Sequence, residues 1–247
     1  MEYSTFVKLA AEFFGTAILM IFGNGAVANV ELKNTKGHHA GWLNIAMGYG
    51  FGVMFPVLMF GGVSGAHINP AMTIAQAVNG LFDWNLVLPY IIAQLLGAAV
   101  GQLVVYITYY PHYKDTEDAD AILGTFCTTD AHNDRVNYFV NEFFGTLVLV
   151  FGALCCLSMP WVEADHAAAS IVVGFIVWGL VTSMGGPTWP DPGPRSHAAT
   201  AARHPADSIQ GLLPLGRGLD SGRRPDSGRY CGCVRVQVVR LIAFNHS

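Results

Sequence analysis

The chain contains 247 residues, of which 52% are hydrophobic and only 12% are charged, about half the charged share of an ordinary soluble domain. This composition, together with 28 glycines and 15 phenylalanines, argues against a water-soluble enzyme and favours a chain that crosses a membrane several times. With 13 basic against 17 acidic residues, nucleic acid is excluded as a partner.

Five apolar stretches are each long enough to cross a hydrocarbon core of about 30 Å as a helix that rises about 1.5 Å per residue. The first stretch is interrupted only by Lys8 and Glu12. The acidic segment 111–134 is predicted to be an exposed connection between the third and fourth stretches. The sequence therefore predicts an all-α membrane protein with spans at about 5–30, 42–61, 86–109, 136–159 and 167–185.

The segment 61–83 is apolar, but its helical part after Asn69 is too short to cross a membrane. Pro70 suits the first turn of a helix, where its missing N–H is not needed. Irregular backbone at membrane depth is tolerated only inside protein or along a watery cavity. We therefore predict a re-entrant half-helix that begins at Asn69, Pro70 and Ala71, preceded by irregular backbone whose carbonyl groups at Gly65, Ala66 and His67 line a watery cavity.

An internal repeat relates the two halves of the chain. Residues 12–16 and 142–146 have the same sequence, Glu-Phe-Phe-Gly-Thr. Three predicted spans separate the copies, so the second half enters the membrane from the opposite side, which defines an inverted-topology repeat. Glu12 and Glu142 open matching spans, where a carboxylate facing lipid is costly, and are expected to face the bundle interior.

The second members of the two halves also align. Gly50 matches Gly174 and Gly61 matches Gly185, both at an offset of 124 residues. If the repeat continued, a second Asn-Pro-Ala would stand at 193–195. The chain has Gly-Pro-Arg there instead, so the match ends where the composition changes.

Three motifs together resemble the aquaporin, or major intrinsic protein, family in its glycerol uptake facilitator branch: AEFFGT at 11–16, SGAHINPA at 64–71 and AQLLGA at 93–98. The resemblance covers residues 1–188, interpreted as one channel domain with repeat one at about 5–109 and repeat two at about 136–188. It implies a right-handed inverted-repeat bundle, with six spans and two half-helices in the intact family and five spans and one half-helix here. Intact members are usually homotetramers of the cell membrane that conduct glycerol, water and similar small neutral solutes passively.

The resemblance also implies roles for individual residues. Glu12 and Glu142 would each brace a re-entrant loop through backbone N–H groups. Tyr49 in the second span and Val181 in the fifth would contribute to the selectivity constriction. Strict water pores carry a histidine at the position of Val181, so valine favours glycerol. The remaining constriction positions fall in the altered region and are not assigned.

The tail 189–247 contains eight arginines and no lysine, whereas residues 1–187 contain only five basic residues. No apolar run in the tail reaches spanning length, and we expect it to be irregular and disordered. We hypothesise a frameshift near Thr188, because the repeat stops there and the composition changes. A shifted reading of codons compatible with residues 189–197 gives Gly-Pro-Ile-Pro-Ala-Arg-Asp-Leu, which resembles the family's second signature. A chain without the second half-helix and sixth span is expected to conduct poorly and to assemble less readily.

Two other functions stay open. A secondary transporter is compatible with inverted repeats and broken helices, although the Asn-Pro-Ala motif argues against it. A non-conducting subunit or pseudogene product is the other. An enzyme is not expected, because polar residues do not cluster within the spans. Scattered cysteines at irregular spacing predict neither disulfides nor a metal site, and no cofactor is expected.

Overall fold

The computed structural model describes residues 3–128, 134–163 and 165–188, and within these ranges the regular structure is entirely helical. The predicted tail 189–247 lies outside the described residues. Five long apolar helices confirm the five predicted spans, with bounds that differ by no more than three residues. The helices are α1 (Thr5–Glu31), α2 (Trp42–Ser64), α3 (Pro70–Val78), α4 (Trp84–Thr108), α5 (Tyr110–Asp115), α6 (Ala119–Gly124), α7 (Arg135–Leu157), α8 (Pro160–Glu163) and α9 (His166–Met184).

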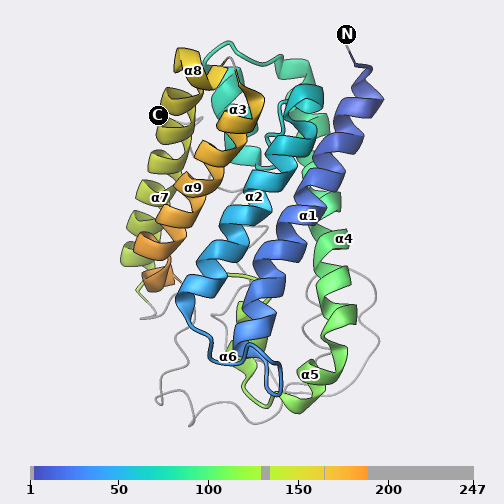
Figure 1. The fold of residues 1–247 in the computed structure, drawn as a ribbon, viewed down its shortest axis with the longest axis vertical. Helices are drawn as coiled ribbons and strands as arrows, with labels where there is room; N and C mark the ends of the chain where they lie inside the picture. The colour runs from blue at the N-terminus through green and yellow to red at the C-terminus, as the bar shows by residue number, and fades with distance from the viewer. Residues whose placement is uncertain (1–2, 129–133, 164, 189–247) are drawn as a thin grey trace, which may run out of the picture.

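The long helices lie side by side in the spatial order α4, α1, α2, α9 and α7 (Figure 1). Glycines allow the closest approach between α1 and α4. A Cβ at Gly97 would overlap the carbonyl oxygen of Phe13, and one at Gly101 would overlap that of Ala17. Two helix backbones can approach this closely only where one of them carries no side chain, so these glycines determine how α4 crosses α1.

The contacts between α2 and α9 are reciprocal, as an inverted repeat requires. The Trp42 ring, at the start of α2, lies where a Cβ of Gly185 would be, and the His166 ring, at the start of α9, lies where a Cβ of Gly61 would be. Trp42 and His166 are separated by the same 124 residues that relate Gly61 to Gly185. Residues that align in the two halves of the sequence therefore make equivalent contacts where α2 meets α9.

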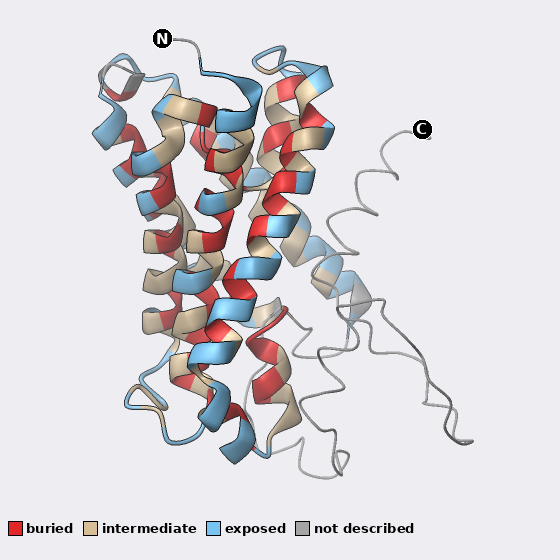
Figure 2. Cartoon of the chain, turned by 90° about the vertical axis from the view of Figure 1, so that its right-hand side faces the viewer, coloured by how far each residue is buried: buried red, intermediate tan, exposed pale blue. Residues whose placement is uncertain are grey.

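The outer sides of the bundle are exposed (Figure 2), and many of the exposed side chains are large and apolar. Only 6% of the residues in the most apolar window of α7 are buried, against 33% in the corresponding windows of α1, α2 and α4. Large exposed side chains along α7 include Phe139, Phe143, Leu147 and Phe151. Apolar surface of this extent is stable in lipid and not in water, which agrees with a multi-pass membrane protein.

The prediction that 111–134 is an exposed connection is wrong for the part that folds into α5 and α6. Helices α5 and α6 fold over one end of the bundle (Figure 1), and Tyr113 is only 1% exposed. Tyr113 packs with Leu32 and Phe126 in a buried cluster, and the backbone N–H of Lys33 donates to Thr116 Oγ1 at 2.9 Å. Acidic residues dominate the composition of this segment, so its composition alone does not reveal that a few aromatic side chains anchor it.

Candidate functional site

The half-helix α3 begins at a complete N-terminal cap. Asn69 has extended backbone, with φ of −150°, and its Oδ1 accepts the backbone N–H of Ala71 at 2.9 Å, while Pro70 occupies the first turn. The nine residues of α3 extend about 13 Å, less than half of the hydrocarbon core. The side-chain NH₂ of Asn69 donates to no acceptor within the described residues, so it can donate to a molecule beside the helix start.

The loop before α3 has an unusual backbone. Gly65, Ala66 and Ile68 have φ values of 86°, 44° and 43°, all in the left-handed region. For residues other than glycine this conformation costs on the order of 1–3 kcal/mol each. No N–H among the described residues donates to the carbonyl oxygens of Gly65, Ala66 or His67. The loop is therefore strained, and it leaves three successive acceptors without internal partners.

Glu12 holds this strained loop in place. The carboxylate is completely buried. Its Oε1 accepts the backbone N–H of His67 at 2.9 Å and the Ser64 hydroxyl at 2.7 Å. Its Oε2 accepts the backbone N–H of Ile68 at 2.7 Å and Gln94 Nε2 at 2.8 Å. Four donors satisfy a carboxylate that would otherwise be too costly to bury.

Gln94 connects the loop to the half-helix. Its Nε2 donates both to Glu12 and to Thr73 Oγ1, the latter at 3.0 Å. Thr73 is completely buried in α3, and its hydroxyl also contacts His67 Nδ1 at 3.2 Å. The His67 ring packs against the ring of Tyr90, 5.3 Å between centroids. The imidazole is thus part of the protein interior, whereas the backbone carbonyl of His67 is without a partner among the described residues.

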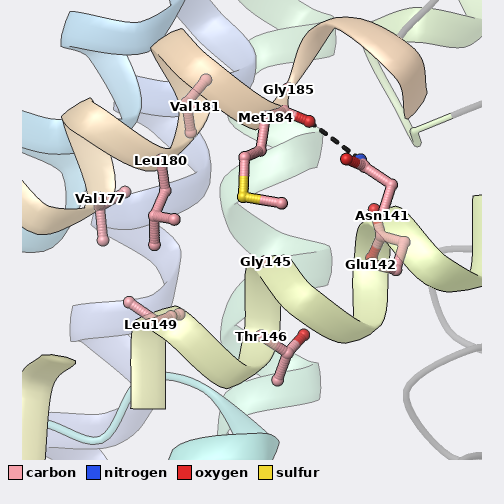
Figure 3. Close-up of a pocket in the computed structure, with 10 residues that line it drawn as sticks. All are labelled: Asn141, Glu142, Gly145, Thr146, Leu149, Val177, Leu180, Val181, Met184 and Gly185. Atoms are coloured by element: carbon pink, nitrogen blue, oxygen red, sulfur yellow. Dashed lines mark hydrogen bonds between the residues drawn. The ribbon is translucent and has the colours of Figure 1, made fainter. Parts of the chain in front are cut away.

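The second half contains a cavity of about 180 Å³ between α7 and α9 (Figure 3). Val181 and Glu142, two residues singled out in the sequence, both line it. Asn141 Nδ2 donates across its rim to the carbonyl of Met184 at 2.9 Å. The complete lining is Asn141, Glu142, Gly145, Thr146, Leu149, Val177, Leu180, Val181, Met184 and Gly185.

The repeat explains where this cavity lies. Gly145 corresponds to Gly15 of the first half. Gly15 faces the loop before α3, because a Cβ added there would lie 2.8 Å from Ile68 Cγ2. The first half therefore fills with its re-entrant loop the space that corresponds to the cavity beside Gly145.

Tyr49 occupies a separate position, against α1. Its ring lies over Gly23, and its hydroxyl donates to Asn24 Oδ1 at 2.5 Å. Asn24 in turn donates to Gln102 Oε1 on α4 at 2.6 Å. Asn24 and Gln102 belong to none of the sequence motifs. Their signal was available, because an amide side chain inside an apolar span is costly unless it is partnered.

The described residues offer no site for a resident metal ion. They contain no group of three or more histidine, cysteine, aspartate or glutamate side chains arranged to bind one. Cys155 and Cys156 are free thiols. The polar groups of the candidate site are instead backbone carbonyls, amides and hydroxyls, which suit uncharged solutes that form hydrogen bonds.

Together, these features define a class of protein. An inverted repeat of membrane-spanning helices, interrupted by a strained loop and a capped half-helix, is the architecture of a membrane channel or transporter. The Major intrinsic protein family matches residues 2–188. The chain belongs to this family.

Individual relatives agree with this assignment. The chain is 50% identical over 200 residues to "Glycerol uptake facilitator protein-like 5" of Lactiplantibacillus plantarum, covering 76% of this chain and 80% of the relative. It is 42% identical over 233 residues to "Glycerol facilitator-aquaporin gla" of Lactococcus lactis subsp. cremoris, covering 77% and 80%. The X-ray structure of the aquaglyceroporin from Plasmodium falciparum superposes with a TM-score of 0.67 and 29% identity, covering 75% of each chain.

Proposed function

We propose that the fold of this chain is that of a passive channel for glycerol, other small neutral solutes and water in the cell membrane. The observation that carries the proposal is the loop of free carbonyl groups that ends at the Asn69 cap. The names of the relatives in Lactiplantibacillus plantarum and Lactococcus lactis support glycerol as the solute. The carbonyls of Gly65, Ala66 and His67 accept hydrogen bonds from solute hydroxyls, and the Asn69 amide donates to solute oxygens.

The start of α3 accounts for the exclusion of cations. A helix N-terminus carries a positive partial charge, which favours oxygen acceptors and repels cations and hydronium. The Asn69 cap uses its Oδ1 on Ala71, which fixes the amide orientation with NH₂ free to donate. A water or glycerol molecule at this point turns its oxygen toward Asn69, and this interrupts a continuous chain of proton-donating waters.

Tyr49 and Val181 are proposed as two constriction residues. A valine side chain presents no hydrogen-bonding group, so the cavity wall at Val181 suits the carbon backbone of a polyol. Tyr49 supplies an aromatic face. Glycerol has carbon atoms on one side and hydroxyl groups on the other, so it suits a channel that offers both apolar side chains and carbonyl acceptors.

The present chain is proposed to conduct poorly. Residues 189–247 contain no second Asn-Pro-Ala motif, and the cavity beside Gly145 corresponds to the space that the loop fills in the first half. We propose that Glu142, like Glu12, braces a re-entrant loop when the second motif is present. Assembly as a homotetramer, usual in the intact family, is proposed to be weakened here as well.

Glycerol efflux from vesicles tests both parts of the proposal. Light scattering compares empty vesicles, vesicles with the 247-residue chain, and vesicles with a version whose reading frame after Thr188 is shifted to restore the second motif. We expect rapid, non-saturating glycerol flux only in the last. Rapid flux through the 247-residue chain would contradict the poor conduction. Absence of flux in the restored version, or flux that saturates and depends on an ion gradient, would contradict a passive channel.

A further inference from the structure

Three polar side chains from three helices form a chain of hydrogen bonds inside the apolar bundle. Tyr49 of α2 donates to Asn24 of α1, and Asn24 donates to Gln102 of α4. Asn24 is 4% exposed and Gln102 is 8% exposed. Amides at membrane depth are costly to retain. This chain of bonds ends on the hydroxyl of a proposed constriction residue, which gives the two amides a use beyond helix packing.

Steric contact fixes the other side of the Tyr49 ring. A Cβ at Gly23 would overlap the ring, so the ring lies against α1 where a glycine leaves room for it. Val27, Val30 and Ile45 form the buried cluster on which Tyr49 packs. The ring is therefore supported by the α1 backbone, while its hydroxyl is held by Asn24.

Gln102 is linked to Tyr49 through Asn24. Its Oε1 accepts from Asn24, whereas its buried Nε2 has no hydrogen-bond partner in the described part of the chain. A buried NH₂ group without a partner is unfavourable, so the burial of Gln102 lowers the free energy of unfolding. Its contribution to the network is to orient the Asn24 amide so that Oδ1 faces the Tyr49 hydroxyl.

We infer that Asn24 and Gln102 are positioning residues that hold the Tyr49 ring in a single orientation. The consequence for transport rests on the proposed function, in which Tyr49 forms part of the constriction. A tethered ring sets a constant width and keeps its hydroxyl occupied by Asn24. Without the tether the ring rotates away from α1 and presents a free hydroxyl, and solutes larger than glycerol are excluded less strictly.

Fluorine NMR of the 247-residue chain in detergent tests the tether. All nine tyrosines are replaced biosynthetically by 3-fluorotyrosine, whose fluorine, adjacent to the hydroxyl, reports its hydrogen bond. Tyr49→Phe assigns the Tyr49 line by its loss. We expect Asn24→Leu to shift that line toward the position of free 3-fluorotyrosine, and Gln102→Leu to shift it less in the same direction. Thr108→Val on α4 is the matched control, because Thr108 donates only to the Val104 carbonyl of its own helix, and should not move the line.

An unchanged Tyr49 line in either folded leucine variant would overturn the inference. Gln102→Leu retains a test if Asn24→Leu does not fold. The transport consequence is measured in the version with the second motif restored, as the ratio of erythritol to glycerol permeability. We expect this ratio to rise in Asn24→Leu but not in Thr108→Val, and an unchanged ratio would overturn the role in selectivity. If that version conducts no glycerol, the proposed function fails, while the fluorine spectrum still decides the tether.

Discussion

Gly50 and Gly174 occupy matching positions in the two halves and contact each other where α2 crosses α9. A Cβ added to Gly50 would lie 3.1 Å from the Gly174 carbonyl oxygen, and a Cβ added to Gly174 would lie 3.0 Å from that of Gly50. Each glycine therefore makes room for the backbone of the other. This reciprocity places the crossing of the two repeats at this pair, and it makes both positions intolerant of a side chain.

Gly174→Ala is expected to destabilise the chain by about 1–3 kcal/mol, because the added methyl group overpacks a contact with backbone atoms that cannot rotate away. Gly179→Ala on the same helix is the control, because nothing lies within 4 Å of its added Cβ. Alanine favours a helix over glycine by up to about 1 kcal/mol, so the control should be stabilised. Thermal unfolding in detergent measures both changes, and equal unfolding temperatures for the two variants would show that the crossing tolerates a methyl group.

Glu12→Gln should loosen the re-entrant loop. The substitution keeps the shape of the side chain but replaces one acceptor oxygen by NH₂, which then faces a backbone N–H donor, His67 on one side or Ile68 on the other. Hydrogen bonds to a charged group contribute about 1.5–3 kcal/mol each, so a loss of about 2–3 kcal/mol in unfolding free energy is expected. Asp83→Asn, at the exposed N-terminal cap of α4, is the control in thermal unfolding and should cost less, because asparagine caps a helix about as well as aspartate. Equal losses in the two variants would contradict the bracing of the first loop by Glu12.

Asn69→Asp separates helix capping from solute recognition. Aspartate caps a helix about as well as asparagine, so thermal unfolding should change by less than about 0.5 kcal/mol. The side chain loses its only donor and gains negative charge at the start of α3. In the version with the second motif restored, we expect lower glycerol permeability and measurable cation leak, read by light scattering and by a potential-sensitive dye. Normal glycerol flux without leak would contradict the role of the Asn69 amide.

Ionisation of the buried Tyr113 phenol is expected to destabilise the folded chain at alkaline pH. Burial raises the pKa of Tyr113 from 10 to about 12, and Thr125 Oγ1, which donates its own hydrogen to the Ile122 carbonyl, accepts the Tyr113 hydroxyl at 2.7 Å. The raised pKa means that folding favours the neutral phenol. The contribution of the neutral Tyr113 phenol to the free energy of unfolding is complete below pH 10 and is lost as the pH rises toward 12. The loss amounts to about 2–3 kcal/mol.

The measurement compares the wild type with Tyr113→Phe, which cannot ionise at this position. The difference in unfolding free energy between the two proteins is followed in detergent from neutral pH to pH 12. We expect the wild type to lose its advantage over the variant only above pH 10. A difference that stays constant over the whole range would show that the phenol ionises as readily in the folded as in the unfolded chain.

The membrane-spanning segments, the half-helix and the inverted repeat can all be predicted from the order of the amino acids. Each of these depends on local chemistry: the length of an apolar run set against the thickness of lipid, Pro70 directly after a capping residue, and a pentapeptide that occurs twice. Each of these signals lies within a few turns of helix, so it can be recognised in the sequence without knowledge of the fold. The cost of a carboxylate in lipid likewise predicts that Glu12 faces the interior.

The contacts between side chains of different helices emerge only in the folded chain. Glu12 and Gln94 are 82 residues apart and Asn24 and Gln102 are 78 apart, and their contacts depend on the crossing of α1 and α4 at Gly97 and Gly101. The burial of Tyr113 likewise depends on how the connection folds back over α1. Hydrogen-bond partners across helices are set by interaxial distance and rotation, which arise from packing all the helices together and cannot be read from any one segment.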